Sequence, residues 1–190
     1  HWFLFSRQGR VQISDVLGIQ TVLGIEIQNA PNTFGSVTIA NSRIEGHVQR
    51  GIQSIAEVFP AGQTTITNTT VNDNSDDQYM GDPQQPAPTN RSGFTLMNNT
   101  VPSTSTHLFY LYNNTFRNFN KGFFVDGTYG FDINRMTNVT ANRNVVINDE
   151  NLADVSDAYA GFKILLGRSN TYSHNQVFST AILEQDYNPV

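Results

Sequence analysis

A five-residue motif recurs along this chain: a glycine, an apolar residue, a residue that is usually polar, and then further alternation. The five copies are GIEIQ, GIQSI, GFTLM, GFFVD and GFKIL, starting at Gly24, Gly51, Gly93, Gly122 and Gly161. An apolar residue at every second position is typical of a β-strand with one buried face. A motif repeated in a fixed frame predicts a repeat protein, in which each copy takes the same place in successive structural units. Three copies place phenylalanine directly after the glycine, so we expect Phe94, Phe123 and Phe162 to stack as one apolar spine.

A second frame follows each copy of the first. Its five copies are TIANSRI (38–44), TITNTTV (65–71), YLYNNTF (110–116), VTANRNV (139–145) and TYSHNQV (171–177). Written under one another, they align Asn41, Asn68, Asn113 and Asn142, with His174 last. Asparagine tolerates the left-handed backbone of a sharp corner, and stacked asparagines can pass hydrogen bonds from one repeat to the next. The frame therefore predicts a corner marked by an asparagine ladder. The stretch VQISDV (11–16) fits as an earlier, degenerate copy with Asp15 near the same column.

These two frames resemble the right-handed parallel β-helix of the pectin-lyase-like superfamily over roughly residues 11 to 185. The resemblance lies in the repeats and includes no catalytic signature. It implies an all-β solenoid with about three short strands per coil, and we expect five to six coils and one domain over 1–190. A sandwich or antiparallel barrel is the alternative fold, but the chain has no Asn-Gly hairpin signal. The best helix candidate is 149–161.

The composition limits the classes of partner. The net charge is −5 and the 11 Lys and Arg residues are scattered, so we expect no nucleic acid partner. Charged residues make up only 14%, and Asn, Thr, Ser, Gln and Gly supply the polar surface, as in many extended β proteins outside the cell. No apolar run is long enough to span a membrane, and the absence of cysteine excludes disulfides and thiolate metal sites. We therefore expect an extracellular or cell-surface location.

Neither end of the chain shows an amphipathic helix that would cap an open β-helix. We therefore expect either a segment of a longer secreted or surface protein or a homo-oligomer, as a trimer or an end-to-end assembly.

Two insertions, 72–92 and 148–160, follow the asparagine corner in alternate coils and hold half of the 16 acidic residues. Loops that gather on one face of a solenoid are the usual binding surface. Three interpretations stay open: a groove that contacts a polysaccharide or cell-surface glycan, a calcium site built from hard oxygen ligands, or a merely solvated acidic face. The glycan-binding candidates are Asp76, Asp77, Tyr79, Asp154, Asp157 and Tyr159. The weak calcium candidates are Asp73, Asp76 and Asp149.

The chain offers no complete set of catalytic residues. The acid and base motifs of polygalacturonases are not met, and we assign no catalytic residue. Cationic residues that a polysaccharide lyase uses as a base are present near the two frames: Arg43, Arg50, Arg117, Lys121 and Arg143. We expect a non-catalytic β-helix module, such as a stalk, adhesin, sheath or tail-spike segment, with glycan-contacting loops. The alternative is a polysaccharide lyase or glycoside hydrolase that uses the groove beside the acidic loops.

Overall fold

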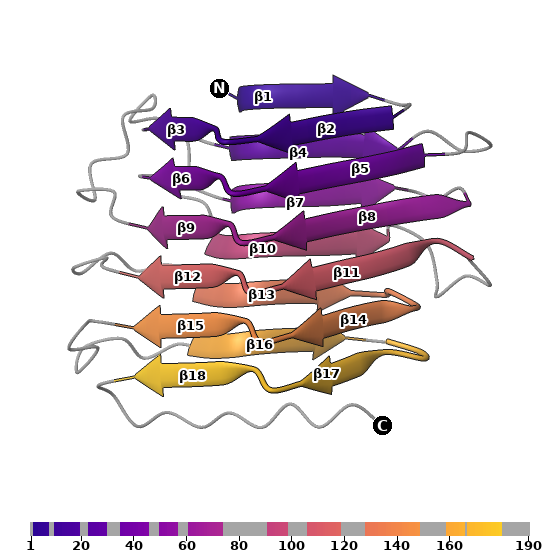
Figure 1. Cartoon of the computed structure of the whole chain (residues 1–190). Helices are drawn as coiled ribbons and strands as arrows, with labels where there is room; N and C mark the ends of the chain where they lie inside the picture. Colours follow the sequence, from indigo (N-terminus) through magenta and orange to yellow (C-terminus); the bar gives the residue numbers. More distant parts are fainter. Residues whose placement is uncertain are drawn as a thin grey trace, which may run out of the picture.

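The chain folds as a right-handed parallel β-helix of six coils, as the repeats predict (Figure 1). The structure is a computed structural model. It describes residues 2–7, 10–19, 23–29, 35–45, 50–56, 61–73, 91–98, 106–118, 128–148, 159–165 and 167–179. Each coil gives one strand to each of three six-stranded sheets, here named A, B and C, and all the pairings are parallel.

Sheet A holds the strands that carry the glycine motif. They are β1 (Trp2–Arg7), β4 (Leu23–Asn29), β7 (Arg50–Ala56), β10 (Arg91–Asn98), β13 (Thr128–Asn134) and β16 (Tyr159–Leu165).

Sheets B and C hold the strands on either side of the asparagine corner. Sheet B contains β2 (Arg10–Ser14), β5 (Gly35–Ala40), β8 (Gly62–Thr67), β11 (Leu108–Tyr112), β14 (Val139–Asn142) and β17 (Thr171–Ser173). Sheet C contains β3 (Leu17–Ile19), β6 (Arg43–Glu45), β9 (Thr70–Asp73), β12 (Thr115–Asn118), β15 (Val145–Asn148) and β18 (Gln176–Ser179). Strand β16 includes part of the segment predicted as helical, so that prediction is wrong for 159–161, and 149–158 lie outside the described residues.

Like residues stack in the core, as the strand register requires. On sheet A the inward column runs through Ile25, Ile52, Phe94, Phe131 and Phe162. The Phe131 ring lies parallel to both neighbouring rings, with centroids 4.7 Å from Phe94 and 4.6 Å from Phe162. Aromatic stacking at such distances adds to the free energy of apolar burial.

The middle residue of this spine is Phe131 rather than the predicted Phe123, which lies outside the described residues. Both phenylalanines follow a glycine. In the strand that forms, Phe131 and Ile133 point inward and polar Asp132 lies between them. The motif at Gly122 instead puts Phe124 at that outward position. With Gly130 in place of Gly122, the distance along the chain from the corner at Asn113 to the glycine of sheet A grows from 9 to 17 positions.

The recurrent glycine has a packing reason. A β-carbon on Gly51 would overlap the Val71 side chain, and one on Gly93 would overlap the Phe116 ring. Val71 and Phe116 are fully buried inward residues of sheet C. The glycine thus leaves the space that the core side chains of the facing sheet occupy.

The corner between sheets B and C differs in one place from the predicted ladder. Left-handed backbone occurs at Asp15, Asn41, Asn68, Asn113, Arg143 and His174. Asn142 is not among them, because it ends β14 and pairs with Tyr112 and Ser173. The predicted alignment of that coil is therefore wrong by one residue, and Arg143 takes the corner position that was assigned to Asn142.

The ladder that carries most of the hydrogen bonds lies one position later, inside the corner. It consists of Ser42, Thr69, Asn114, Asn144 and Asn175. Asn114 and Asn144 are fully buried. In the predicted column, Asn68 donates one long bond of 3.4 Å to Asn41. The corner therefore combines an exposed left-handed residue with a buried, hydrogen-bonded one.

The coils differ in length. Corresponding corner residues of successive coils are 26, 27, 45, 30 and 31 positions apart. The longest coil, from Thr69 to Asn114, contains the first acidic insertion, as the sequence predicts.

Candidate functional site

Most of the predicted loop residues lie outside the described part of the chain. They are Asp76, Asp77, Tyr79, Asp149, Asp154 and Asp157. Only the backbones of Asp73 and Tyr159 are placed: Asp73 ends β9 in sheet C and Tyr159 begins β16 in sheet A. The loop groove and the calcium site thus stay predictions.

Within the described residues, no three His, Asp or Glu side chains gather as metal ligands. No helix among those residues has the length and apolar character to cross a membrane.

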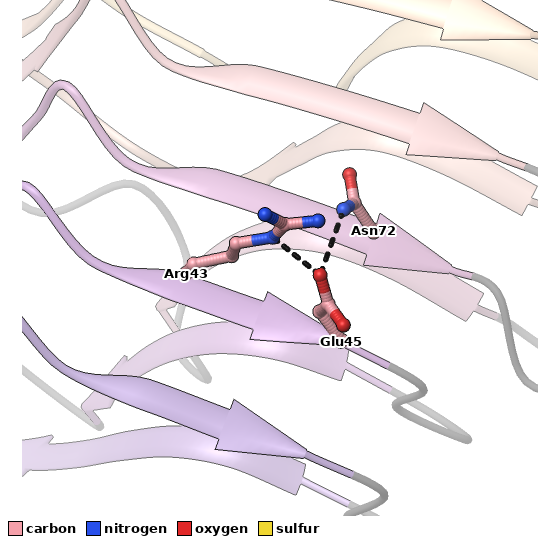
Figure 2. A network of polar contacts seen from close by, with 3 residues as sticks. All are labelled: Arg43, Glu45 and Asn72. Atoms are coloured by element: carbon pink, nitrogen blue, oxygen red, sulfur yellow. Dashed lines mark hydrogen bonds and ion pairs between the residues drawn. The ribbon is translucent and has the colours of Figure 1, made fainter.

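The outer face of sheet C carries a small polar network (Figure 2). The guanidinium of Arg43 forms an ion pair with Glu45, which also accepts a 3.4 Å hydrogen bond from the Asn72 side-chain amide on the next strand. The Arg43 side chain is 59% exposed, so the pair contributes little to stability.

The outer face of sheet A is polar but closed. Glu26, Gln53, Thr95 and Asp132 occupy one column across four strands, and each is buried. Gln53 donates a 3.1 Å hydrogen bond to the Glu26 carboxylate and accepts one from Arg50. Gln53 and Glu26 thus satisfy one another, and the Thr95 hydroxyl shares a hydrogen bond with Ser92. The column therefore offers little accessible surface to a ligand.

Arg50 is the cation of this network. Burial lowers its pKa, while the negative charges of Asp132 and Glu26 oppose the shift. Arg50 is half-buried and bonded to Gln53, so its guanidinium belongs to the polar network of sheet A.

The outer face of sheet B is partly exposed and carries an aromatic pair. Tyr110 and Tyr112 alternate with the buried Leu111 on β11, so both point outward. Their rings are nearly parallel, with centroids 5.7 Å apart. Burial and the neighbouring Tyr110 raise the pKa of Tyr112. We call Tyr110 and Tyr112 the tyrosine pair.

Hydroxyl and amide side chains flank the tyrosine pair on the two nearest strands to either side. In the two columns that contain the tyrosines, these neighbours are Thr38, Thr65, Thr67, Thr140, Asn142, Thr171 and Ser173. The Asn142 amide donates a 2.8 Å hydrogen bond to the Ser173 hydroxyl, so part of the array is already ordered. Hydroxyls both donate and accept hydrogen bonds, and partly exposed ones keep this capacity for a ligand. Sheet B therefore combines apolar ring surface with rows of neutral polar groups.

His107 lies inside the coil and not on this surface. It is fully buried, its Nε2 lies 2.9 Å from the Thr64 hydroxyl, and its ring packs on Phe109 at 4.5 Å. These contacts give it a structural role in the core.

Sequence reasoning missed the tyrosine pair as a site because it sought function in the insertions. The signal was present in the second frame. The first part of this frame forms a strand of sheet B, and in TIT (65–67) and YLY (110–112) outward Thr or Tyr residues alternate with inward apolar ones. The outward columns of a stacked sheet follow directly from that alternation.

No protein-family model, curated protein or solved structure in the comparisons matches this chain. The fold is therefore shown by its own strand pairing, and function must be argued from the surface chemistry.

Proposed function

We propose that this chain is a non-catalytic carbohydrate-binding β-helix module of the pectin-lyase-like type, located outside the cell or on its surface. The observation that carries the proposal is the tyrosine pair on the outer face of sheet B, set among threonine, serine and asparagine side chains.

The chemistry of this face matches that of a sugar. A pyranose ring has apolar C–H faces and a rim of hydroxyls, and tyrosine offers an apolar ring with a polar tip. The neighbouring Thr65, Thr140 and Asn142 supply donors and acceptors for the rim. The strand stacking repeats these groups about every 4.8 Å along the axis, which suits an extended polymer.

Rigidity also supports the proposal. Tyr110 and Tyr112 flank Leu111, whose side chain is fully buried in the core. Binding then needs little ordering of the backbone at β11, and such preorganisation lowers the cost of association.

A binding panel tests this function. The protein is incubated with soluble neutral and acidic polysaccharides, and binding is followed by affinity electrophoresis and calorimetry. The variants are Tyr110→Ala, Tyr112→Ala and the double variant. Leu17→Ala is the control because Leu17 is also a large exposed apolar residue, 55% exposed, but on sheet C.

We expect at least one polysaccharide to bind, the double tyrosine variant to lose most of the affinity, and Leu17→Ala to bind as the parent does. Binding that survives the double variant unchanged contradicts the proposal, as does the absence of binding across the panel.

A polysaccharide lyase is the second candidate, favoured by the position of Arg50, a half-exposed arginine beside the buried polar column of sheet A whose pKa burial lowers. In this hypothesis the neutral guanidine form of Arg50 takes the C5 proton next to a uronate carboxylate and becomes a guanidinium, and the C4–O glycosidic bond breaks as the C4–C5 double bond forms. The test is the ultraviolet absorbance of unsaturated products from acidic polysaccharides. Product formation by the parent and its loss in Arg50→Gln, with the fold retained, would replace the non-catalytic proposal.

A further inference from the structure

Exposed arginines lie beside the strands of sheet B in the two coils that follow the tyrosine pair. Arg143 occupies the left-handed corner position directly after β14, where the preceding coils have Asn41, Asn68 and Asn113. The Asn113 backbone N–H donates a 3.2 Å hydrogen bond to the Asn142 carbonyl, and Asn142 pairs with Tyr112. The corner that holds Arg143 therefore lies next to the corner that follows Tyr112. Its side chain is exposed. One strand step, about 4.8 Å, separates it from the tyrosine strand.

A second exposed cation lies on the other side of sheet B, where its strands begin. Arg168 lies before β17 and forms a parallel bridge with Thr137, which precedes β14. Its amide donates a 3.1 Å hydrogen bond to the Met136 carbonyl, so its backbone is held in the stack. Arg143 and Arg168 thus lie at the two ends of the short strands β14 and β17, with the exposed His174 directly after Arg143 in the corner column.

Acidic side chains are scarce on this face. In the described strands of sheet B and the corners beside them, the one acidic residue is Asp15, in the first coil. Four strand steps separate Asp15 from Arg143, about 19 Å, which exceeds the screening length of about 8 Å at physiological salt. The chain as a whole has a net charge of −5. The positive charge at the end of sheet B is therefore a local feature that opposes the overall charge.

We propose that the ligand of sheet B is an anionic polysaccharide, which packs a sugar ring on the tyrosine pair and places carboxylate or sulfate groups at Arg143 and Arg168. This inference rests on the proposed carbohydrate-binding function and assigns its substrate class. A guanidinium pairs with two oxygens of a carboxylate or sulfate at once, which gives both affinity and orientation. The bound chain runs from β11 across β14 to β17, along the axis of the solenoid.

Aromatic rings beside cations also suit single-stranded nucleic acid. Affinity for a polyphosphate depends on contacts with many phosphates, whereas the coils after the tyrosine pair offer two exposed arginines beside the described strands of sheet B. The rows of neutral hydroxyls next to the rings match sugar hydroxyls better than they match bases. We therefore assign the glycan and include an oligonucleotide in the test.

The experiment compares polymers that share a backbone and differ in charge. Dextran sulfate is paired with dextran, and carboxymethyl cellulose with hydroxyethyl cellulose, so that sulfate and carboxylate are tested separately; oligo(dT) is the nucleic acid probe. The variants are Arg143→Gln, Arg168→Gln and their double variant. Arg10→Gln is the matched control, since Arg10 is an exposed arginine on the same sheet at its other end.

We expect the charged member of at least one pair to bind more tightly than its neutral partner, and added salt to reduce that preference. The double arginine variant should lose about tenfold in affinity for the charged polymer, as charge-assisted hydrogen bonds at an exposed site imply. Arg10→Gln should bind as the parent does.

The two proposals fail in different ways. Equal binding of charged and neutral polymers, abolished by the tyrosine variants and unchanged by the arginine variants, would overturn the anionic ligand and keep carbohydrate binding. Binding that neither the tyrosine variants nor the arginine variants change would overturn both the carbohydrate-binding function of this face and the anionic ligand. Binding of oligo(dT) as tight as that of the charged glycans would overturn the assignment to polysaccharide.

Discussion

The buried asparagine at the corner gives the sharpest test of how the coils are held together. The Asn144 side chain is fully buried and makes four hydrogen bonds. Its Oδ1 accepts from the Asn114 amide at 3.1 Å and from the Asn114 side chain at 3.0 Å. Its Nδ2 donates at 2.9 Å to the Leu111 carbonyl and at 2.9 Å to Asn175. Asn144→Ala removes all four and leaves buried backbone groups in adjacent coils without that partner.

A typical hydrogen bond contributes about 1 kcal/mol net, and an unsatisfied buried group costs about 1 to 3 kcal/mol. We therefore expect Asn144→Ala to lower the free energy of unfolding by about 3 to 5 kcal/mol. The matched control is Asn142→Ala, two positions earlier, whose side chain is half-buried and bonds to Ser173 at 2.8 Å. That change should cost about 1 kcal/mol or less.

Urea denaturation followed by circular dichroism measures both losses, and hydrogen exchange at the Asn114 amide reports the local effect. If Asn142→Ala costs as much as Asn144→Ala, or if Asn144→Ala costs less than 1 kcal/mol, the inner ladder does not hold the corner.

Three further changes probe the core and the last coil. Phe131→Ala should cost about 3 to 5 kcal/mol in denaturant melts, because it leaves a cavity between two stacked rings; a loss under 1 kcal/mol would contradict the spine. Gly93→Ala should cost about 1 to 3 kcal/mol, because the added methyl overlaps the Phe116 ring and the Gly130 carbonyl; an unchanged melting temperature would refute this packing. Burial raises the pKa of Tyr172 to about 12, from an ordinary value of 10.0, while Asn170 opposes the shift. The unfolded chain then loses its proton first, so the contribution of Tyr172 to stability should be constant below about pH 10 and fall by about 2 kcal/mol toward pH 12. Tyr172→Phe should make the loss of stability between pH 10 and pH 12 smaller than that of the parent by about this amount, and a loss equal to the parent's would contradict the assignment.

The fold was predictable because its signals repeat. Four of the five glycine motifs begin at the glycines that sheet A uses, and Asp15 occupies the corner column of an earlier coil as expected. Stacked repeats place like residues over like, so each copy supports the interpretation of the others.

The errors arose where two frames competed within a few residues. Gly122-Phe123 and Gly130-Phe131 both fit the motif, and the alternation of Phe131, Asp132 and Ile133 decides for the second. At the corner, the aligned frame put Asn142 in the column of Asn113, which Arg143 occupies, and a slip of one residue moves every side chain to the other face of a strand. Burial decides the alignment, since Asn144 is fully buried, as Asn114 is, and Asn142 is not.

The candidate site was harder to predict, since surface residues are under no packing constraint that the sequence records. The prediction looked to acidic insertions, whereas the tyrosine pair belongs to a regular strand. Its partners Thr140 and Arg143 are 30 or more positions away and meet it only through the register of the coils. That register depends on the coil length, which the sequence left ambiguous at the Gly122 and Gly130 motifs.

Hydrogen exchange with mass spectrometry, on the protein with and without the charged polysaccharide that it binds, tests the central claim most directly. We predict that protection on binding appears in peptides covering 106–118 and 135–148 and extends into 167–176. Protection confined to the acidic insertions 74–90 and 149–158, with sheet B unchanged, would contradict the account.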